Sequence, residues 1–387
     1  EGFLSNILLS LIKFSNQEVE KGMEIFEKIP NHYNNLKKIQ NVFLLCYLDD
    51  SKTFTAFEEL VNDERIDYSR YNFFLINYLL SKNRIGEAKK AIESSKSKYD
   101  SNLLLSQTEL FFKNNKSKNI ISFFNCKNPK DSLAEFFYVI ANLYASENDY
   151  RISNFYLNIS LHLNKNFLAN KALLAENFYY QKKYKSSKDI YFSIKEIGKT
   201  YSWHASKNIA SIILIEKGKK YSIKNLEKDF KLLKNPQIEH YYELANFYKD
   251  NEYYEESIKY YSLALEKITK DHYLYPKILD RRGTSYERIG KWEKAEKDLI
   301  GSLEIIPDQP HVLNYLAYSW IDMGINIDKG LEMLKKATEL RKNDGYIIDS
   351  LGWAYYAKKN YTKAKFFLQK AVELLPSDPI ISDHYAD

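Results

Sequence analysis

Glycine and proline are scarce in this chain of 387 residues, with 12 and 8 copies respectively. These two residues are the usual means of ending a helix or closing a tight turn. Their shortage leaves few positions for the many short turns that an all-β domain needs. The composition therefore favours an all-α chain.

An excess of one charge and long apolar runs are also missing. The 57 basic residues nearly balance the 51 acidic ones, for a net charge of +6. Over this length the field is weak and neither requires nor excludes a nucleic-acid partner. No run approaches the roughly 18 apolar residues of a membrane-spanning helix. We predict no transmembrane segment, and we interpret residues 1–14 as an amphipathic first helix and not as a signal peptide.

Recognisable catalytic and metal-binding motifs are absent as well. The seven histidines are scattered, and none forms an H-x3-H pair or a Cys/His cluster with metal-ligand spacing. No glycine-rich phosphate or dinucleotide motif and no G-x-S-x-G motif occurs. We therefore predict a protein that is not an enzyme, with no metal and no cofactor.

What the chain does contain is a repeat. Gly283, Ala317 and Gly352 lie 34 and 35 residues apart, and each is followed three residues later by an aromatic residue. Upstream, a weaker form of the pattern continues in steps of 38, 35, 35 and 34 residues. Its small residues are Ala245, Ala210, Ala175 and Ala141. A period of about 34 residues is typical of stacked two-helix units.

The spacing inside each unit indicates a pair of helices. Residues three and four apart share a helix face, so Leu279, Gly283 and Tyr286 form a stripe on a first helix. Ala295 and Leu299 form the facing stripe on a second helix. A lone hairpin cannot bury its apolar face, so neighbouring units must stack. We predict an all-α fold, a right-handed α–α superhelix of about eleven helical hairpins.

The quality of the repeat divides the chain into four stretches. We expect divergent helical hairpins over residues 1–133, degenerate repeats over 134–275, well-matched repeats over 276–379 and the start of a further helix over 380–387. The second-helix pattern is weaker in the middle stretch. There Ser153, Ser187 and Ser257 stand at positions where alanine is expected, and Gly218 interrupts one unit.

These repeats resemble the tetratricopeptide repeat family over roughly residues 134–379, most strongly from residue 276 onward. The segments 314–322 and 344–354 are similar to a group of bacterial, chiefly alphaproteobacterial, tetratricopeptide proteins. Many members of that group are exported or associated with the cell envelope. The resemblance therefore favours the bacterial periplasm or envelope slightly over the cytoplasm.

The two cysteines, Cys46 and Cys126, are expected to be far apart in such an array. They are separated by more than two repeats, which corresponds to a distance on the order of 20 Å if hairpins stack in order, whereas a disulfide needs Cα atoms within about 7 Å. We predict no disulfide and interpret both residues as small buried apolar side chains. The cysteines therefore do not indicate a compartment.

In the tetratricopeptide family, ligands usually lie along the concave face, which first-helix residues line. Some members hold a C-terminal carboxylate with paired Lys and Asn, a pair that no repeat has here, so the resemblance argues against that ligand. It implies a groove lined with amide and aromatic side chains. The predicted partner-binding residues are Tyr138, Asn142, Tyr242, Asn246, Asn314, Tyr318, Asp349 and Trp353.

A second candidate surface is the basic stretch over residues 217–234, which has seven lysines against Glu227 and Asp229. Such a stretch could meet phosphate, anionic lipid or an acidic protein, or could be an ordinary solvated face. The lysines singled out as an anionic-partner patch are Lys217, Lys219, Lys220, Lys224 and Lys228.

The function that fits these features best is a non-catalytic scaffold that binds a helical or extended segment of a partner protein in its concave groove. The resemblance slightly favours a place in an envelope-associated bacterial assembly. Two alternatives stay open: an RNA-binding helical-repeat protein, and an accessory factor in the assembly or export of an envelope polymer. The sequence leaves the partner and the oligomeric state undefined.

Overall fold

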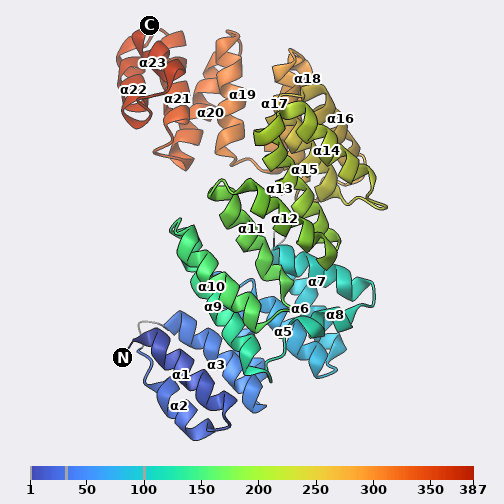
Figure 1. The fold of residues 1–387 in the computed structure, drawn as a ribbon. Coiled ribbons are helices and arrows are strands. Elements are labelled where there is room, and N and C mark those ends of the chain that lie inside the picture. The colour runs from blue at the N-terminus through green and yellow to red at the C-terminus, as the bar shows by residue number, and fades with distance from the viewer. Residues whose placement is uncertain (1, 31–33, 99–101) are drawn as a thin grey trace. The chain divides into compact units, whose positions relative to one another are not determined.

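The computed structural model describes residues 2–30, 34–98 and 102–387, which form 23 α-helices and no β-strand (Figure 1). The helices make eleven successive pairs and one final helix, which confirms the predicted all-α fold of helical hairpins. Residues 1, 31–33 and 99–101 of the predicted N-terminal part lie outside the described residues. No helix in the described ranges is both long and apolar enough to cross a membrane.

The helices belong to two compact units, residues 1–222 and residues 223–387, and the division falls inside α14. Unit 1 contains α1 (Phe3–Ser15), α2 (Val19–Glu27), α3 (Asn34–Leu48), α4 (Thr53–Val61), α5 (Tyr71–Ser81), α6 (Ile85–Lys98), α7 (Leu103–Lys113), α8 (Ser117–Phe123), α9 (Pro129–Ser146), α10 (Tyr150–Leu163), α11 (Lys171–Tyr180), α12 (Tyr184–Ile194), α13 (Lys199–Lys217) and the start of α14 (Lys219–Lys231). Unit 2 contains the rest of α14, then α15 (Ile238–Asp250), α16 (Tyr254–Leu265), α17 (Tyr275–Arg288), α18 (Trp292–Ile305), α19 (Pro310–Asp322), α20 (Ile327–Leu340), α21 (Gly345–Ala357), α22 (Tyr361–Leu374) and α23 (Pro379–Ala386). Each unit is described by itself below.

The turn inside the hairpins is built in one recurring way. After the first helix, one residue adopts a left-handed backbone, such as Lys182 with φ 59° or Gly290 with φ 72°. The next residue donates its N–H to the carbonyl five positions earlier, as from Lys183 to Phe178 at 2.8 Å. This is a common way for a helix to end, and it reverses the chain without a proline. The scarcity of proline and glycine is therefore compatible with many turns.

The small residues of the repeat lie where two paired helices cross. A Cβ atom added at Gly352 would lie 2.7 Å from Leu368 Cγ, and one added at Gly283 would lie 3.0 Å from Leu299 Cγ. The serines that replace alanine in the middle stretch serve the same crossing. Ser187 is 0% exposed, and its hydroxyl donates to the Ala175 carbonyl oxygen at 2.8 Å. Serine therefore fits because the hairpin supplies an acceptor for its hydroxyl.

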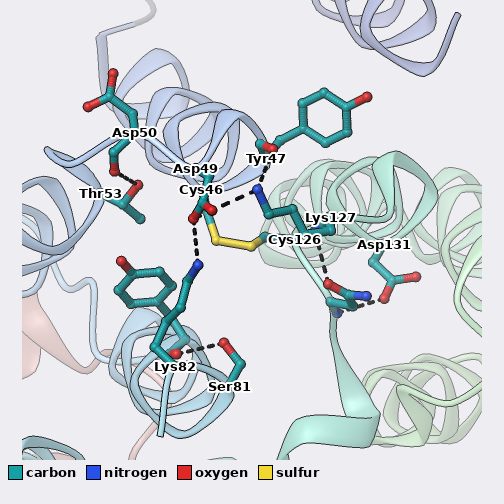
Figure 2. Close-up of a disulfide and its surroundings, with 12 residues drawn as sticks. Cys46, Tyr47, Asp49, Asp50, Thr53, Ser81, Lys82, Cys126, Lys127 and Asp131 are labelled. Atoms are coloured by element: carbon teal, nitrogen blue, oxygen red, sulfur yellow. Dashed lines mark hydrogen bonds and ion pairs between the residues drawn. A yellow bond between two sulfur atoms is a disulfide. The ribbon is translucent and has the colours of Figure 1, made fainter. Parts of the chain in front are cut away.

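The two cysteines form a disulfide, so the prediction that they stay apart was wrong. Their Cα atoms lie 5.8 Å apart, and the close-up in Figure 2 shows the bond. The prediction assumed that hairpins stack strictly in chain order. Instead α9 packs against both α1 and α3. Cys46 lies near the end of α3 and Cys126 in the connection before α9, so the return of the chain to α3 brings the two sulfur atoms together.

Polar contacts hold the segment around Cys126 in place. The Lys127 Nζ atom donates to the Tyr47 carbonyl oxygen at 2.9 Å, across the same junction between α3 and the start of α9 (Figure 2). Asp131, in the first turn of α9, accepts a hydrogen bond from the Asn125 backbone N–H at 2.8 Å. The disulfide therefore joins two segments that also contact each other without it.

Reducing the disulfide should destabilise unit 1. The bond closes a loop with a sequence separation of 80 residues, for which chain entropy gives a loss of about 4 kcal/mol when it is cut. We expect hydrogen exchange in urea to show unit 1 unfolding at lower urea concentration after reduction and alkylation. Unit 2 has no cysteine and is the internal control. Equal urea midpoints for unit 1 in the oxidised and reduced protein would contradict this expectation.

Candidate functional site

The first helices of unit 2 are α15, α17, α19 and α21, and they carry six of the predicted partner-binding residues. On α15 the residues Tyr242 and Asn246 meet the same side chain, Tyr261. The Tyr261 hydroxyl donates to Asn246 Oδ1 at 2.5 Å, and its ring lies 6.2 Å from the Tyr242 ring. Burial raises the pKa of Tyr261, so its hydroxyl stays protonated and keeps donating. This part of the surface is therefore ordered before any partner arrives.

On α19 the predicted residues Asn314 and Tyr318 are both half-buried. The Asn314 Oδ1 atom has no hydrogen-bond partner among the described residues. The atom is also shielded from solvent, and a buried acceptor without a donor costs about 1–3 kcal/mol. A donor from outside could satisfy it only if the Asn314 side chain turned toward the surface.

On α21 the predicted residues Asp349 and Trp353 both contact His384 of the final helix, α23. The His384 Nδ1 and Asp349 Oδ2 atoms lie 2.8 Å apart, and the imidazole stacks on the Trp353 ring with centroids 4.3 Å apart at 18°. The Tyr318 ring lies 6.1 Å from the same imidazole. Three predicted residues therefore converge on one histidine, which is only 7% exposed.

Sequence reasoning did not identify His384 as part of this surface. It placed a helix start over residues 380–387, and that helix is present as α23. The histidine itself was treated as one of seven scattered residues. Its position near the end of a short helix gave no signal, because only the packing of α23 beside α21 shows which residues it meets.

In unit 1 the predicted residues Tyr138 and Asn142 lie on α9 with different surroundings. Asn142 is exposed, whereas the guanidinium of Arg70 lies over the Tyr138 ring, 3.8 Å from its centroid. The same guanidinium makes two 2.8 Å hydrogen bonds to Glu135, which is 0% exposed. Tyr138 is thus part of a buried ion-pair cluster that joins α9 to the start of α5.

The five lysines of the basic stretch are exposed, at the end of α13 and along α14. Lys220, Lys224 and Lys228 recur every four residues and so share one face of α14. These three make no ion pair with any described residue. The other face is buried, with Leu226 at 0% exposure. The structure thus places a row of ammonium groups on an otherwise ordinary amphipathic helix.

Within the described ranges, no group of three or more His, Cys, Asp or Glu side chains is arranged to hold a metal ion. The features that do gather are aromatic rings, amides and a few carboxylates on first helices. Such side chains bind through contact area and hydrogen bonds. The arrangement is therefore of the kind that recognises a ligand by contact.

Comparison with known sequences identifies two segments of unit 2. Residues 238–266 and residues 346–378 each match the tetratricopeptide repeat. A TPR repeat-containing protein of Pseudomonas aeruginosa is 28% identical over 103 residues, which are 27% of this chain and 18% of that protein. The matched segment thus spans less than a fifth of the length of that curated relative.

Comparison with solved structures returns helical-repeat proteins. The C-terminal part of a TPR repeat-containing protein from Cytophaga hutchinsonii has a TM-score of 0.42 and 14% identity, over 64% of this chain and 98% of that one. MamA from Desulfovibrio magneticus RS-1 has a TM-score of 0.38 and 19% identity, over 46% and 97%. YrrB, described as a TPR protein with an unusual peptide-binding site, has a TM-score of 0.37 and 19% identity, over 47% and 90%.

The contact between α23 and α21 should weaken as the pH rises. Burial lowers the pKa of His384, but the hydrogen bond and charge of Asp349 outweigh it, so the pKa lies above its ordinary value of 6.5. The charges of Asp383 on the same helix and of Asp387 directly after it act in the same direction. Because the pKa is raised, the protonated His384 stabilises the contact between α23 and α21. This stabilisation is complete below pH 6.5 and is lost as the pH rises through the raised pKa.

Amide exchange of α23, corrected for its intrinsic pH dependence, measures this effect. We expect lower protection in alkaline buffer than in mildly acidic buffer. The His384→Gln variant keeps a hydrogen-bond donor but does not titrate, so its α23 protection should not vary in this range. The same pH dependence in wild type and variant would show that another group is responsible.

Proposed function

Because this chain is a tetratricopeptide-repeat protein, we propose that it is a protein-interaction scaffold whose unit 2 binds an extended or helical segment of a partner along its first helices. The observation that carries the proposal is the recurrence of aromatic, amide and carboxylate side chains at the same positions of successive first helices. Repeats that stack present such positions side by side, as a continuous surface.

The chemistry of the surface suits a peptide. Tyr242 and Tyr318 are half-buried, so their rings offer contact area at little cost in side-chain entropy. The Asn314 Oδ1 atom is buried and unpaired, so a turn of this side chain toward the partner segment would let it accept a backbone N–H. The carboxyl of Asp280 on α17 adds negative charge, and burial raises its pKa while Arg281, Lys249 and His311 oppose that shift. A segment with donors and some positive charge would fit these groups.

RNA binding is the second candidate, and the row of lysines on α14 is the observation that favours it. Phosphate contacts by lysine are insensitive to sequence and are weakened strongly by salt. Lys220, Lys224 and Lys228 have no carboxylate partner among the described side chains to neutralise them. An acidic protein segment would meet the same row equally well, so the nature of the partner has to be measured.

Capture of partners from the native host, with crosslinking and mass spectrometry and with or without nuclease, separates these candidates. We expect a protein partner that survives nuclease and crosslinks to α15, α17, α19 or α21. Nucleic acid in the eluate, with partners lost on nuclease treatment, would instead support the RNA candidate and make the α14 lysines the residues to mutate. An envelope role is supported if the captured partner is an envelope protein.

The double variant Tyr242→Ala with Tyr318→Ala should weaken binding of the captured partner by about tenfold or more, since buried tyrosines are frequent energetic centres of interfaces. Tyr242 and Tyr318 approach Tyr261 and His384 only through rings 6.2 and 6.1 Å apart. Asn246 accepts a hydrogen bond from Tyr261, and Trp353 stacks on His384 at 4.3 Å, so replacing these two would disturb the fold more. Calorimetric titration measures the affinity, and circular dichroism checks that helicity is kept.

A matched control is the double variant Tyr361→Ala with Phe366→Ala. Both residues lie on α22, a second helix, and are 60% and 64% exposed. The control leaves every first-helix side chain in place, although the Tyr361 ring lies 5.7 Å from the Tyr356 ring of α21, and it should bind like wild type. If the control loses affinity and the first-helix variant does not, the binding surface lies on the second helices.

A further inference from the structure

The disulfide is the feature of unit 1 that the proposed function does not use. The chain has two cysteines, and the fold places both in one bond across a sequence separation of 80 residues. Stable structural disulfides occur in oxidising compartments and are rare in the cytosol, where thiols are kept reduced. A chain whose only cysteines meet in this way is suited to an oxidising environment.

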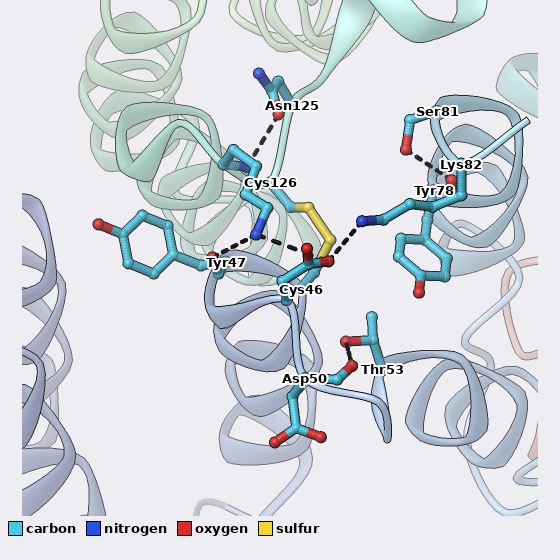
Figure 3. Close-up of polar contacts among 11 residues, drawn as sticks. Cys46, Tyr47, Asp50, Thr53, Tyr78, Ser81, Lys82, Asn125 and Cys126 are labelled. Carbon is cyan, nitrogen blue, oxygen red and sulfur yellow. Dashed lines mark hydrogen bonds and ion pairs between the residues drawn. A yellow bond between two sulfur atoms is a disulfide. The ribbon is translucent and has the colours of Figure 1, made fainter.

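The two sulfur atoms differ in accessibility. Cys46 lies within α3 and is 2% exposed. Cys126 is half-buried and lies in the short connection between α8 and α9, next to the exposed Asn125 (Figure 3). Lys127, the residue after it, is also exposed. A connection can open locally at low cost, whereas a buried helix position is reached only if α3 itself moves. An outside reagent therefore meets Cys126 first.

Charged side chains surround the bond. Lys82 Nζ is 2.5 Å from Asp49 Oδ1, and Lys127 Nζ is 3.8 Å from the same oxygen, so two ammonium groups flank one carboxylate. Figure 2 shows these side chains, and that of Asp50, around the two sulfur atoms. The acidic side chains balance the lysines, so the order in which the two cysteines react follows from their difference in burial.

We propose that this chain folds in an oxidising compartment outside the cytosol, where a disulfide-donating oxidoreductase links Cys46 to Cys126 by way of a mixed disulfide on Cys126. The inference does not depend on what unit 2 binds. It stands on the position, burial and surroundings of the two cysteines, all of which lie in unit 1.

The chemistry proceeds in two exchanges. The Cys126 thiolate attacks one sulfur of the donor's disulfide, which forms the mixed disulfide and releases one donor thiolate that takes up the proton Cys126 has lost. The Cys46 thiolate then attacks Cys126 Sγ, the protein disulfide forms, and the second donor cysteine leaves as a thiolate that takes up the second proton. Two thiols of this chain are oxidised by two electrons, and the donor disulfide is reduced to two thiols.

Contacts within unit 1 bring the two cysteines together for the second exchange. The Lys127 ammonium donates to the Tyr47 carbonyl oxygen, and Tyr47 directly follows Cys46. The packing of α9 against α1 and α3 brings the Cys126 segment to the end of α3 independently of the bond. Folding therefore presents Cys46 to the mixed disulfide.

The state of the cysteines in the native host tests the compartment. Cells are quenched in acid, and the full chain is labelled with a maleimide that adds mass to each free thiol. We expect no label on the protein from untreated cells and two labels after reduction before labelling. Two free thiols in untreated cells would overturn the proposal, whatever partner unit 2 binds.

The order of attack is tested with single-cysteine variants of the full chain. The Cys46→Ala variant should accumulate a mixed disulfide on Cys126, with the oxidoreductase in cells or with oxidised glutathione in vitro. The Cys126→Ala variant should form at least about tenfold less adduct in the same time, because Cys46 is buried. Equal adduct formation by both variants would show that Cys126 is not the entry point.

A control on the wild-type chain keeps the test valid if a cysteine variant fails to fold. The reduced wild-type protein is treated briefly with oxidised glutathione, quenched, and digested, and the modified cysteine is identified by mass spectrometry. The adduct is expected on Cys126 at early times. Adduct on Cys46 at those times would reverse the assignment even if neither variant folds.

Discussion

The close approach of two helix backbones inside each hairpin is the constraint on which the repeat architecture depends. It allows only a small residue at the crossing, as the 2.7 Å distance from a Cβ at Gly352 to Leu368 shows. Alanine fills the same place at Ala175, where Ser187 adds a hydrogen bond to the carbonyl. The larger apolar residues around the crossing then bury their surface between neighbouring hairpins, which is where the stability of such a fold resides.

Unit 1 adds contacts that a simple stack would not contain. The helix α9 packs against α1 and α3, and the Arg70–Glu135 ion pair joins it to the start of α5. Such a buried pair costs desolvation, so its role is better understood as fixing one arrangement of these helices than as adding stability. The disulfide stabilises the same junction because it lowers the conformational entropy of the unfolded chain. Three different interactions thus hold α9 where it lies.

The candidate binding surface follows from the same periodicity that builds the core. Equivalent positions recur on successive first helices, so Asn314 and Asp349, 35 residues apart, lie on neighbouring first helices, where Asn314 is half-buried and Asp349 is only 5% exposed. What each position does depends on its neighbours. Asn314 Oδ1 has no hydrogen-bond partner among the described residues, whereas Asp349 and Trp353 hold His384 of α23. The surface is therefore regular in sequence and uneven in the hydrogen bonds and charges it offers.

The sequence by itself determined the all-α class, the hairpins and the positions of the crossings, because these depend on contacts between residues a few turns apart in the chain. The resemblance to the tetratricopeptide family added Asp349, Trp353 and Tyr318 as candidates, because it implies a binding face on the first helices. Only the tertiary structure decided that Cys46 meets Cys126, that Arg70 covers Tyr138 and that His384 joins the α21 surface. The cysteine and Arg70 contacts join hairpins of unit 1 that are distant in the chain. The His384 contact joins two helices across a repeat boundary. A local pattern cannot specify such contacts, because they depend on how each hairpin packs against hairpins other than itself.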